Sequence, residues 1–196
     1  MAQRRSTDEL KKAIYQATID LLENDGYEKI TFQNVAKRAE TTRSVIYRYW
    51  ENPSQLIFEA ARFVMTQNAA WRGSVVDQNF NNGDLRSDLI EMLKFMQVNF
   101  SLYPKNFLPY LFFEQARGKT AFSERVDEIT VHNLVIMERI LARAQERGEA
   151  RENIAQAAKL LAFQSSRYHI MIDGSPMTNE QIDEYVDDVL LPLYLK

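Results

Sequence analysis

The sequence TFQNVAKRAETTRSVIYRYW, residues 31–50, contains two short helical segments separated by a turn. The hydroxyl of Thr31 suits an N-cap, and the apolar residues that follow repeat at helical spacing: Phe32, Val35, Ala36 and Ala39. Residues 40–42 are too few for anything but a tight turn. A second helix is expected to begin at Thr42 or Arg43 and to end at Tyr49 or Trp50. The stretch therefore predicts a helix, a three-residue turn and a helix.

The second of these helices has one aromatic side and one cationic side. Ile46, Tyr49 and Trp50 share a side at spacings i, i+3 and i+4, so we expect them to pack inward. The opposite side carries polar and basic residues, with a valine at its edge: Arg43, Ser44, Val45, Tyr47 and Arg48. In the major groove of DNA, arginine bonds guanine edges, hydroxyls bond phosphates and valine contacts a thymine methyl. This surface therefore predicts binding to double-stranded DNA.

The charge of the chain is distributed unevenly in the same sense. The 196 residues have a formal net charge of −3, yet residues 37–48 contain four basic residues and one acidic residue. DNA responds to this local charge, because the acidic remainder can face away from it. The change of sign indicates two parts of the chain with different partners.

Helical patterns continue on both sides of this stretch. Ser6 and Glu9 have the spacing of a capping box, and Gly26 can end the first helix in a left-handed conformation. Asn52 followed by Pro53 predicts an N-cap and the first position of a fourth helix, which is expected to end near residue 71. Further helices are expected at 84–103, 123–147, 153–172 and 178–195.

These patterns predict an all-α fold with two domains. Six glycines and five prolines allow few turns, which favours long helices over many short strands. We expect a three-helix DNA-binding domain with a helix-turn-helix at 1–52. A larger helical domain for ligand binding and dimerisation is expected at 53–196.

The composition argues against catalysis and metal binding. The chain has no cysteine, which excludes disulfides, thiolate catalysis and cysteine-based zinc sites. It also has no phosphate-binding glycine loop and no Gly-x-Ser-x-Gly motif. His132 and His169 each have one carboxylate a helical turn away, at Glu128 and Asp173, which is too few ligands for a metal site. We therefore expect no enzyme activity, no cofactor and no metal.

Unbroken apolar runs in this sequence are short. Those at 134–137 and 160–163 are typical, and both are far shorter than a membrane-spanning helix. The N-terminal sequence MAQRRSTDEL has no apolar stretch of the kind found in signal peptides. We expect a cytoplasmic protein without a membrane partner.

The order of motifs over roughly residues 10–60 resembles the tetracycline-repressor (TetR) family of bacterial transcription regulators. The matching residues are the apolar stripe of the first helix, Gly26-Tyr27, Thr31, Val35-Ala36, Ala39, 46–50 and Leu56. The resemblance implies that phosphates are contacted by the start of the fourth helix and by Thr31, Thr42 and Tyr47. It implies that the residues facing bases are Arg43, Ser44, Val45 and Arg48. A C-terminal domain that binds a small molecule and dimerises through its last two helices is implied as well.

Two positions depart from the family pattern. The family usually has glycine and then an aliphatic residue in the turn, where this chain has Glu40 and Thr41. Either Glu40 adopts a conformation that glycine adopts freely, at some cost in free energy, or the turn differs slightly from that of the family. The family often has lysine at the start of the fourth helix, where this chain has Pro53. These departures leave an alternative open, namely a helical ligand-binding or interaction protein without specific operator recognition.

Aromatic and methionine residues are concentrated in the part of the chain expected to bind a ligand. An apolar pocket with a few polar groups is the usual form of such a site. The candidate lining residues are Met92, Phe95, Met96, Asn99, Phe100, Tyr110, Gln115, Arg167 and Tyr168. We expect a small, mainly apolar effector that releases the protein, acting as a repressor, from a palindromic operator.

The last two predicted helices are the expected homodimer interface. The alanine-rich helix 153–172 allows another helix to approach closely. The helix 178–195 has more apolar residues than one face can bury within the monomer. A second copy of the chain is the simplest partner, and two-fold symmetry matches a palindromic operator.

Overall fold

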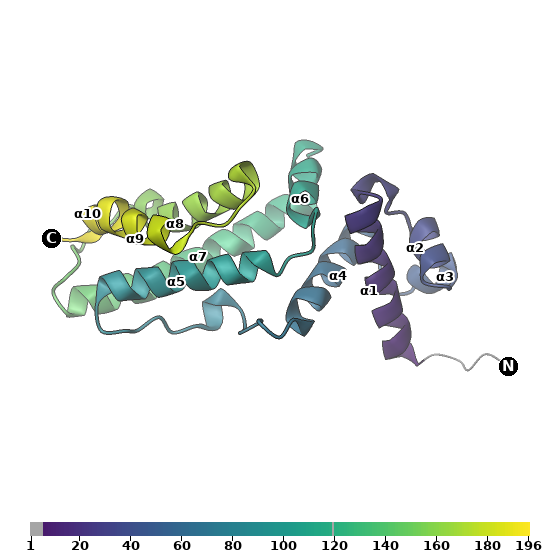
Figure 1. Cartoon of the computed structure of the whole chain (residues 1–196), viewed down its shortest axis with the longest axis horizontal. Coiled ribbons are helices and arrows are strands. Elements are labelled where there is room, and N and C mark those ends of the chain that lie inside the picture. Colours follow the sequence, from purple (N-terminus) through teal and green to yellow (C-terminus); the bar gives the residue numbers. More distant parts are fainter. Residues whose placement is uncertain (1–5, 119) are drawn as a thin grey trace. The chain divides into compact units, whose positions relative to one another are not determined.

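The computed structural model describes residues 6–118 and 120–196, without the side chains of 120–126 and 171. Residues 1–5 of the predicted first domain therefore lie outside the described part. The chain is helical, as predicted, and the described residues contain no strand beyond a single bridge between Ala150 and Leu195 (Figure 1). It forms two compact units, one of residues 6–71 with Leu102–Phe113, the other of Arg72–Ser101 with Glu114–Lys196.

The first unit contains the predicted helix-turn-helix. Its elements are α1 (Thr7–Asn24), η1 (Tyr27–Lys29), α2 (Phe32–Arg38), α3 (Arg43–Ile46), α4 (Pro53–Gln67) and the first part of α6 (Phe107–Ala116). One apolar core joins them, with buried residues that include Ile14, Leu22, Val35, Ile46, Leu56, Ile57, Ala60, Phe107 and Tyr110. Because α4 packs along α1, this compact unit continues to Trp71.

The helix caps expected from the sequence are present in this unit. The Ser6 hydroxyl accepts the backbone N–H of Glu9 at 3.2 Å, and the Glu9 carboxylate accepts the backbone N–H of Ser6 at 2.8 Å. The Asn52 side chain accepts the N–H of Gln55 at 2.9 Å, with Pro53 at the first helical position. These bonds satisfy N–H groups that a helix start otherwise leaves unpaired, and they fix where α1 and α4 begin.

The segment 102–113 joins the first unit although the sequence places it between α5 and α7. Phe107 and Tyr110 are buried in the core shared with α1 and α4. Asn106 has a positive φ of 65°, and its amide donates to the carbonyl of Leu22 at 3.1 Å. This long-range bond supports a backbone conformation that costs free energy in residues other than glycine.

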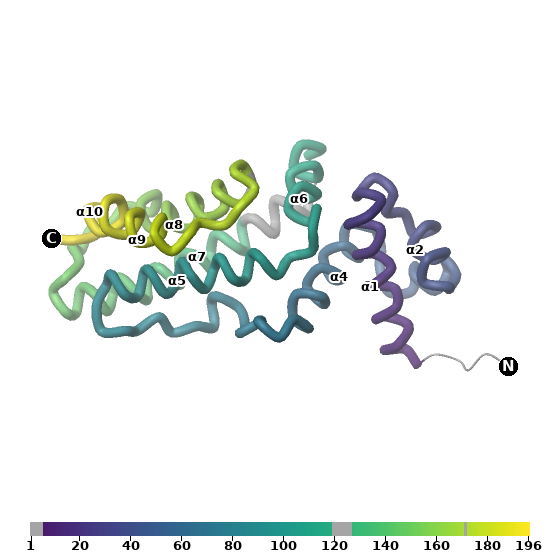
Figure 2. Tube along the Cα trace, in the orientation of Figure 1, coloured from purple at the N-terminus to yellow at the C-terminus, as the bar shows by residue number. Residues whose placement is uncertain are grey.

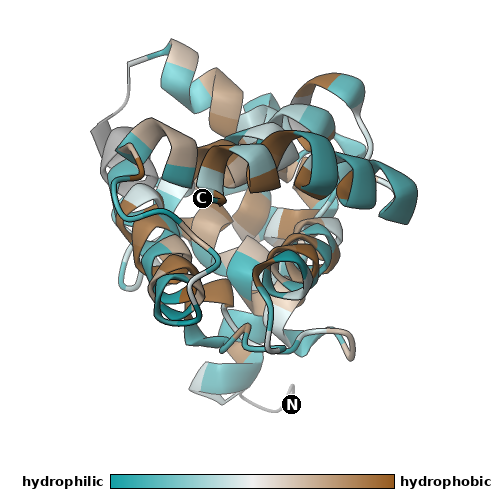
Figure 3. Cartoon of the chain, turned by 90° about the vertical axis from the view of Figure 1, so that its left-hand side faces the viewer, coloured by the Kyte–Doolittle hydropathy of each residue, from teal (hydrophilic) through white to brown (hydrophobic). Residues whose placement is uncertain are grey.

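The second unit contains η2 (Val75–Asp77), α5 (Leu85–Ser101), α7 (Thr120–Glu146), α8 (Gln156–Tyr168), η3 (His169–Asp173), α9 (Asn179–Tyr185), η4 (Val186–Leu190) and α10 (Leu191–Tyr194). In this unit α5, α7 and α8 pack against one another (Figure 2). Hydrophobic and hydrophilic residues alternate along the helices (Figure 3). The buried core includes Leu89, Met92, Leu93, Met137, Ile140, Phe163 and Val186.

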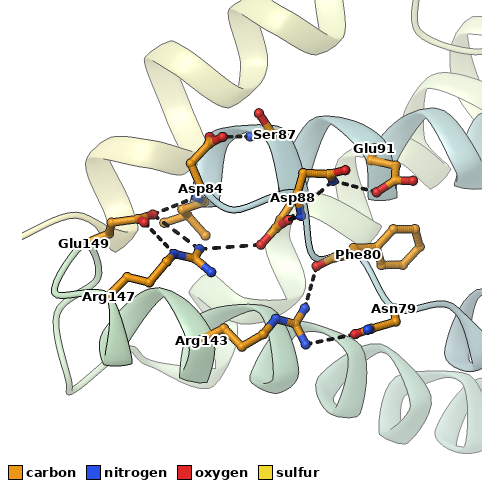
Figure 4. A network of polar contacts seen from close by, with 11 residues as sticks. Asn79, Phe80, Asp84, Ser87, Asp88, Glu91, Arg143, Arg147 and Glu149 are labelled. Carbon is orange, nitrogen blue, oxygen red and sulfur yellow. Dashed lines mark hydrogen bonds and ion pairs between the residues drawn. The ribbon is translucent and has the colours of Figure 1, made fainter.

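A polar network fixes the start of α5 to the end of α7 (Figure 4). The Glu149 carboxylate accepts the backbone N–H of Leu85 at 2.7 Å and pairs with Arg147, whose guanidinium holds the pKa of Glu149 below its ordinary value. Arg147 also lies 3.6 Å from the fully buried Asp88. Arg143 donates to Asn79 and to the carbonyl of Phe80. Within the second unit, the network holds the segment before α5 against α7.

Two predicted helices are interrupted by wider turns. The predicted helix 153–172 ends its α-helical part at Tyr168 and continues as the π-helical turn η3. The predicted helix 178–195 contains the π-helical turn η4 before α10. Pro192 has no N–H to donate to the carbonyl four residues earlier, so a regular α-helix cannot continue through this position.

No helix among the described residues is both long enough and apolar enough to cross a membrane.

Candidate nucleic-acid interface

The turn between α2 and α3 keeps the left-handed position usually occupied by glycine, which is the first of the two possibilities that the sequence leaves open. Glu40 has a positive φ of 52°, in the left-handed region usually occupied by glycine. The N–H of Thr41 donates to the carbonyl of Ala36 at 2.9 Å, which closes the end of α2. Thr42 is then extended and forms the N-cap position of α3. A glutamate therefore performs the backbone role of glycine here, at some cost in free energy.

The recognition segment, defined as residues 43–50, is less regular than the sequence suggests. Its α-helical part is only Arg43–Ile46, and the chain continues in single turns, with the N–H of Trp50 bonded to the carbonyl of Ile46 at 3.1 Å. Ile46 and Trp50 are buried as expected. Tyr49 is only half-buried, and the ammonium of Lys11 lies 4.8 Å from the centre of its ring.

The residues predicted to contact DNA lie mainly on the exposed side of this segment. Arg43, Ser44 and Arg48 are exposed, and Val45 is half-buried at the edge. Tyr47 is 55% exposed, and its ring packs edge-on against Phe32 at 4.8 Å between ring centres. This packing fixes the position of the ring, and Arg43 donates a hydrogen bond to the Tyr47 hydroxyl at 3.3 Å.

The two predicted phosphate-binding threonines are exposed at the starts of helices. Thr31 caps α2 by accepting the N–H of Asn34 at 3.1 Å. The hydroxyl of Thr42 lies 3.3 Å from that of Ser44. A hydroxyl that accepts a backbone N–H can still donate its own proton, so capping by Thr31 is compatible with a phosphate contact.

Glu59, a half-buried carboxylate on α4, was not predicted from the sequence. Its Oε2 accepts the indole N–H of Trp50 at 2.8 Å and the hydroxyl of Tyr15 at 3.0 Å, and its Oε1 accepts the side-chain amide of Gln55 at 3.2 Å. Burial, followed by the bond and charge of Glu59, raises the pKa of Tyr15 to about 12. The available signal was a lone carboxylate one turn after the buried Leu56.

The candidate ligand residues are divided between the two units. Five lie on α5: Met92 and Met96 are buried in the core, Asn99 is mostly buried, and Phe95 and Phe100 are half-buried. The Asn99 amide donates to the carbonyl of Gly73 at 3.3 Å. The remaining four lie on other elements. Tyr110 is in the core of the first unit, Gln115 and Tyr168 are exposed, and Arg167 is half-buried on α8.

Two buried amides in the second unit were not predicted from the sequence. Gln97 on α5 is 7% exposed and Asn133 on α7 is 8% exposed. Among the described residues, neither the amide nitrogen nor the oxygen of Gln97 has a hydrogen-bond partner, and the same holds for the amide nitrogen of Asn133. Unpaired buried amides cost free energy, so these two residues mark a polar part of an apolar core. Helical periodicity identifies the apolar residues that are buried, such as Met96, but it does not identify a polar residue that is buried beside them, such as Gln97.

The Nδ1 atom of His169 lies 2.8 Å from the carboxylate Oδ2 of Asp173 within η3. In the described part of the chain, no three histidine, cysteine, aspartate or glutamate side chains are close enough to hold a metal ion together.

Taken with this geometry, comparison with known proteins defines the class as a helix-turn-helix DNA-binding regulator. The model of the family described as "Bacterial regulatory proteins, tetR family" matches residues 14–60. The model of the family described as "Tetracyclin repressor-like, C-terminal domain" matches residues 81–189, more than half of the chain. The chain therefore belongs to the TetR family, which confirms the predicted resemblance. Regulators of this family bind DNA and usually act as dimers.

Individual relatives agree with this assignment. The DNA-binding transcriptional repressor TetR of Mycobacteroides abscessus is 27% identical over 181 residues, covering 92% of each chain. SmeT, the repressor of the Stenotrophomonas maltophilia multidrug efflux pump SmeDEF, has a TM-score of 0.57 at 21% identity, covering 95% of this chain and 90% of SmeT. The protein SCO7518 from Streptomyces coelicolor A3(2) has a TM-score of 0.58 at 17% identity, covering 92% of this chain and 98% of SCO7518. These two structures show the fold, and the relatives are regulators rather than enzymes, as predicted.

Proposed function

We propose that this protein is a cytoplasmic, homodimeric repressor that leaves a palindromic operator when a small, mainly apolar effector binds. The main support is that the recognition segment has one buried side and one exposed side. Ile46 and Trp50 are buried, so Arg43, Ser44 and Arg48 are presented together on the exposed side. Arginine and hydroxyl side chains on one short helical surface match the base edges and phosphates of a major groove.

Selection from random duplex DNA tests this proposal. The protein should enrich a sequence with two inverted half-sites whose centres are about one DNA turn, roughly 34–36 Å, apart. Its affinity for a scrambled duplex of the same composition should be lower at matched salt. Binding of all duplexes with equal affinity would instead support the alternative of a helical protein without operator recognition.

The proposed dimer uses the last helices of the second unit, about 153–172 and 178–195. Large apolar side chains are exposed there, on the end of α8, on η3, on η4 and near the C-terminus: Tyr168, Ile172, Val189 and Leu195. Exposed apolar residues on neighbouring elements are typical of a surface that another chain covers. A two-fold arrangement would pair the same surface of both copies and place two recognition segments on one operator.

The proposed effector site lies in the second unit, among α5, α7 and α8. Met92, Met96 and Phe95 supply adaptable apolar surface. Gln97 and Asn133 supply buried amides whose hydrogen-bonding capacity is unused among the described residues. Burial also lowers the pKa of Arg167 on α8, in the absence of an acidic partner among the described residues. This combination supports an effector that is mainly apolar and carries one group able to accept and donate hydrogen bonds.

The Gln97 amide allows a test that does not require the effector. Gln97→Leu should raise the free energy of unfolding by about 1–3 kcal/mol, because an unpaired buried amide is replaced by an apolar side chain. Gln164→Leu on the exposed surface of α8 is the matched control and should change it by less than about 0.5 kcal/mol. A loss of stability in Gln97→Leu would mean that the amide is already bonded in the free protein.

A first effector probe is triclosan, because a SmeT–triclosan complex is among the structures with a similar fold. Its two aromatic rings and one hydroxyl have the chemistry proposed for the effector. If it binds, operator affinity should fall roughly 5- to 150-fold, and operator DNA must weaken triclosan binding by the same factor. Binding of triclosan with unchanged operator affinity would leave a binding site and remove the proposed switch, since only differential affinity shifts an equilibrium.

A further inference from the structure

Glu59 connects three segments of the first unit through one carboxylate. Its two oxygens accept hydrogen bonds from Tyr15 on α1, from Trp50 at the end of the recognition segment, and from Gln55 one turn earlier on α4. Gln55 in turn accepts the backbone N–H of Glu51 at 3.1 Å. The carboxylate therefore restrains the end of the recognition segment directly, through the side chain of Trp50. Through Gln55 it also restrains the backbone of Glu51, the next residue.

The donors to this carboxylate are all neutral groups. Among the residues that the structure describes, no lysine or arginine forms an ion pair with Glu59. Hydrogen bonds to an ionised acceptor are shorter and roughly twice as strong as bonds between neutral groups. Glu59 thus uses its charge to orient Trp50 and Tyr15 and not to neutralise a cation.

The recognition segment needs such a restraint because its own helix is short. Only Arg43–Ile46 is α-helical, and residues 47–50 continue in single turns, so the segment is too short to hold its direction without tertiary contacts. Its end is fixed instead by Trp50, which is buried and packs edge-on against Tyr15 with ring centres 5.6 Å apart. The position of the indole is set by packing, and its rotation is set by the bond to Glu59.

We propose that Glu59 is a positioning residue for operator recognition, which holds the recognition segment in register with α4 through Trp50. This inference rests on the proposed operator binding and adds a residue that does not itself touch DNA. A displacement of α4 would move the carboxylate and, with it, the end of the segment that carries Arg48. Base contacts depend on this position, whereas general attraction to phosphates does not.

The test compares specific with non-specific DNA binding in variants of the full chain. The probes are the duplex that the parent protein enriches from a random pool and a scrambled duplex of equal composition. Glu59→Ala should lower the ratio of the two affinities about tenfold or more, with non-specific affinity changed less than about twofold. Trp50→Phe, which removes the N–H and keeps an aromatic ring, should lower the ratio in the same way. The double variant Glu59→Gln/Trp50→Phe should lose little more than the larger single effect.

Two further measurements separate positioning from simple loss of stability. Ile57→Val removes one buried methyl group from the same helix and should leave the affinity ratio unchanged. Glu59→Gln, which keeps the shape and one acceptor oxygen, should give an intermediate ratio even if Glu59→Ala does not fold. A Glu59→Gln or Trp50→Phe variant with the parent's ratio overturns the inference, as does an additive double variant. If the parent enriches no duplex, the proposed function fails as well, which distinguishes the two results.

Discussion

The indole N–H of Trp50 donates a 2.8 Å hydrogen bond to the carboxylate of Glu59, although Trp50 ends the recognition segment and Glu59 lies inside α4. The buried side of the segment is therefore fixed to the helix behind it. This arrangement determines which side chains remain outside. Tyr47 and Arg48 lie in the same turn before Trp50, and both are exposed. The inward contacts and the proposed DNA contacts are thus two sides of one short segment.

Arg48 should contribute to the choice of sequence as well as to affinity. Arg48→Ala should weaken binding to the enriched duplex by about 1–3 kcal/mol and reduce discrimination at one base pair of each half-site. Arg48→Lys keeps the charge but loses the planar pair of donors, so it should restore general affinity more than discrimination. Competition binding against single-base variants of the duplex measures both effects. Unchanged discrimination in both variants would show that Arg48 reads no base.

Tyr47 should contribute through its hydroxyl without reading sequence. Tyr47→Phe keeps the ring that packs on Phe32, so the fold should be unaffected. Loss of the hydroxyl should weaken all duplexes by a similar amount, about 0.5–1.5 kcal/mol, if it bonds a phosphate. Titrations of the enriched and scrambled duplexes at one salt concentration test this. A loss confined to the enriched duplex would assign the hydroxyl to a base instead.

The positive φ of Glu40 should be a removable cost. Glu40→Gly should raise the free energy of unfolding by about 0.5–1 kcal/mol, because glycine adopts φ near 52° without strain. Gln33→Gly, at an exposed position inside α2, is the matched control and should lower it by a similar amount. Urea unfolding of the three proteins measures the difference. Destabilisation by both glycines would mean that the turn is not strained.

The stability of the first unit should decline at high pH through Tyr15. Burial and Glu59 raise the pKa of Tyr15 from its ordinary value of 10.0 to about 12. Between these values the unfolded chain releases the phenolic proton and the folded chain keeps it, so unfolding is favoured as pH rises. The stabilisation is complete below pH of about 10 and is lost as pH rises to about 12. Urea unfolding at several pH values should show a smaller decline in Tyr15→Phe than in the parent, and equal declines would contradict the assignment.

The proposed dimer surface should be sensitive to charge at Ile172. Ile172 is 63% exposed on η3, and Val131 is 58% exposed on α7, outside the proposed surface. Ile172→Asp should convert dimers to monomers in sedimentation at micromolar concentration, because a charge is expensive to bury in an apolar contact. Val131→Asp should leave the dimer intact. Dissociation by Val131→Asp alone would place the contact on α7.

Some features of this protein were determined by residues close together in the sequence. The capping box at Ser6 and the N-cap at Asn52 follow from hydrogen bonds within one helical turn, and the structure contains both. The glycine pattern of the family indicates a left-handed conformation of Glu40 as one of two possibilities, and the structure contains it. The burial of Ile46 and Trp50 follows from helical periodicity. Local geometry suffices for each of these because only neighbouring residues are involved.

Other features were decided only by tertiary packing. The segment 102–113 joins the first unit because Phe107 and Tyr110 complete a core whose other members lie 45 or more residues earlier. Glu59 gains its function from donors on α1 and the recognition segment, which the sequence does not place beside it. The amide of Gln97 is unpaired because neighbouring helices cover it without supplying a partner among the described residues. Contacts between distant segments depend on how helices pack, and periodicity along one helix carries no information about the residues that another helix will bring.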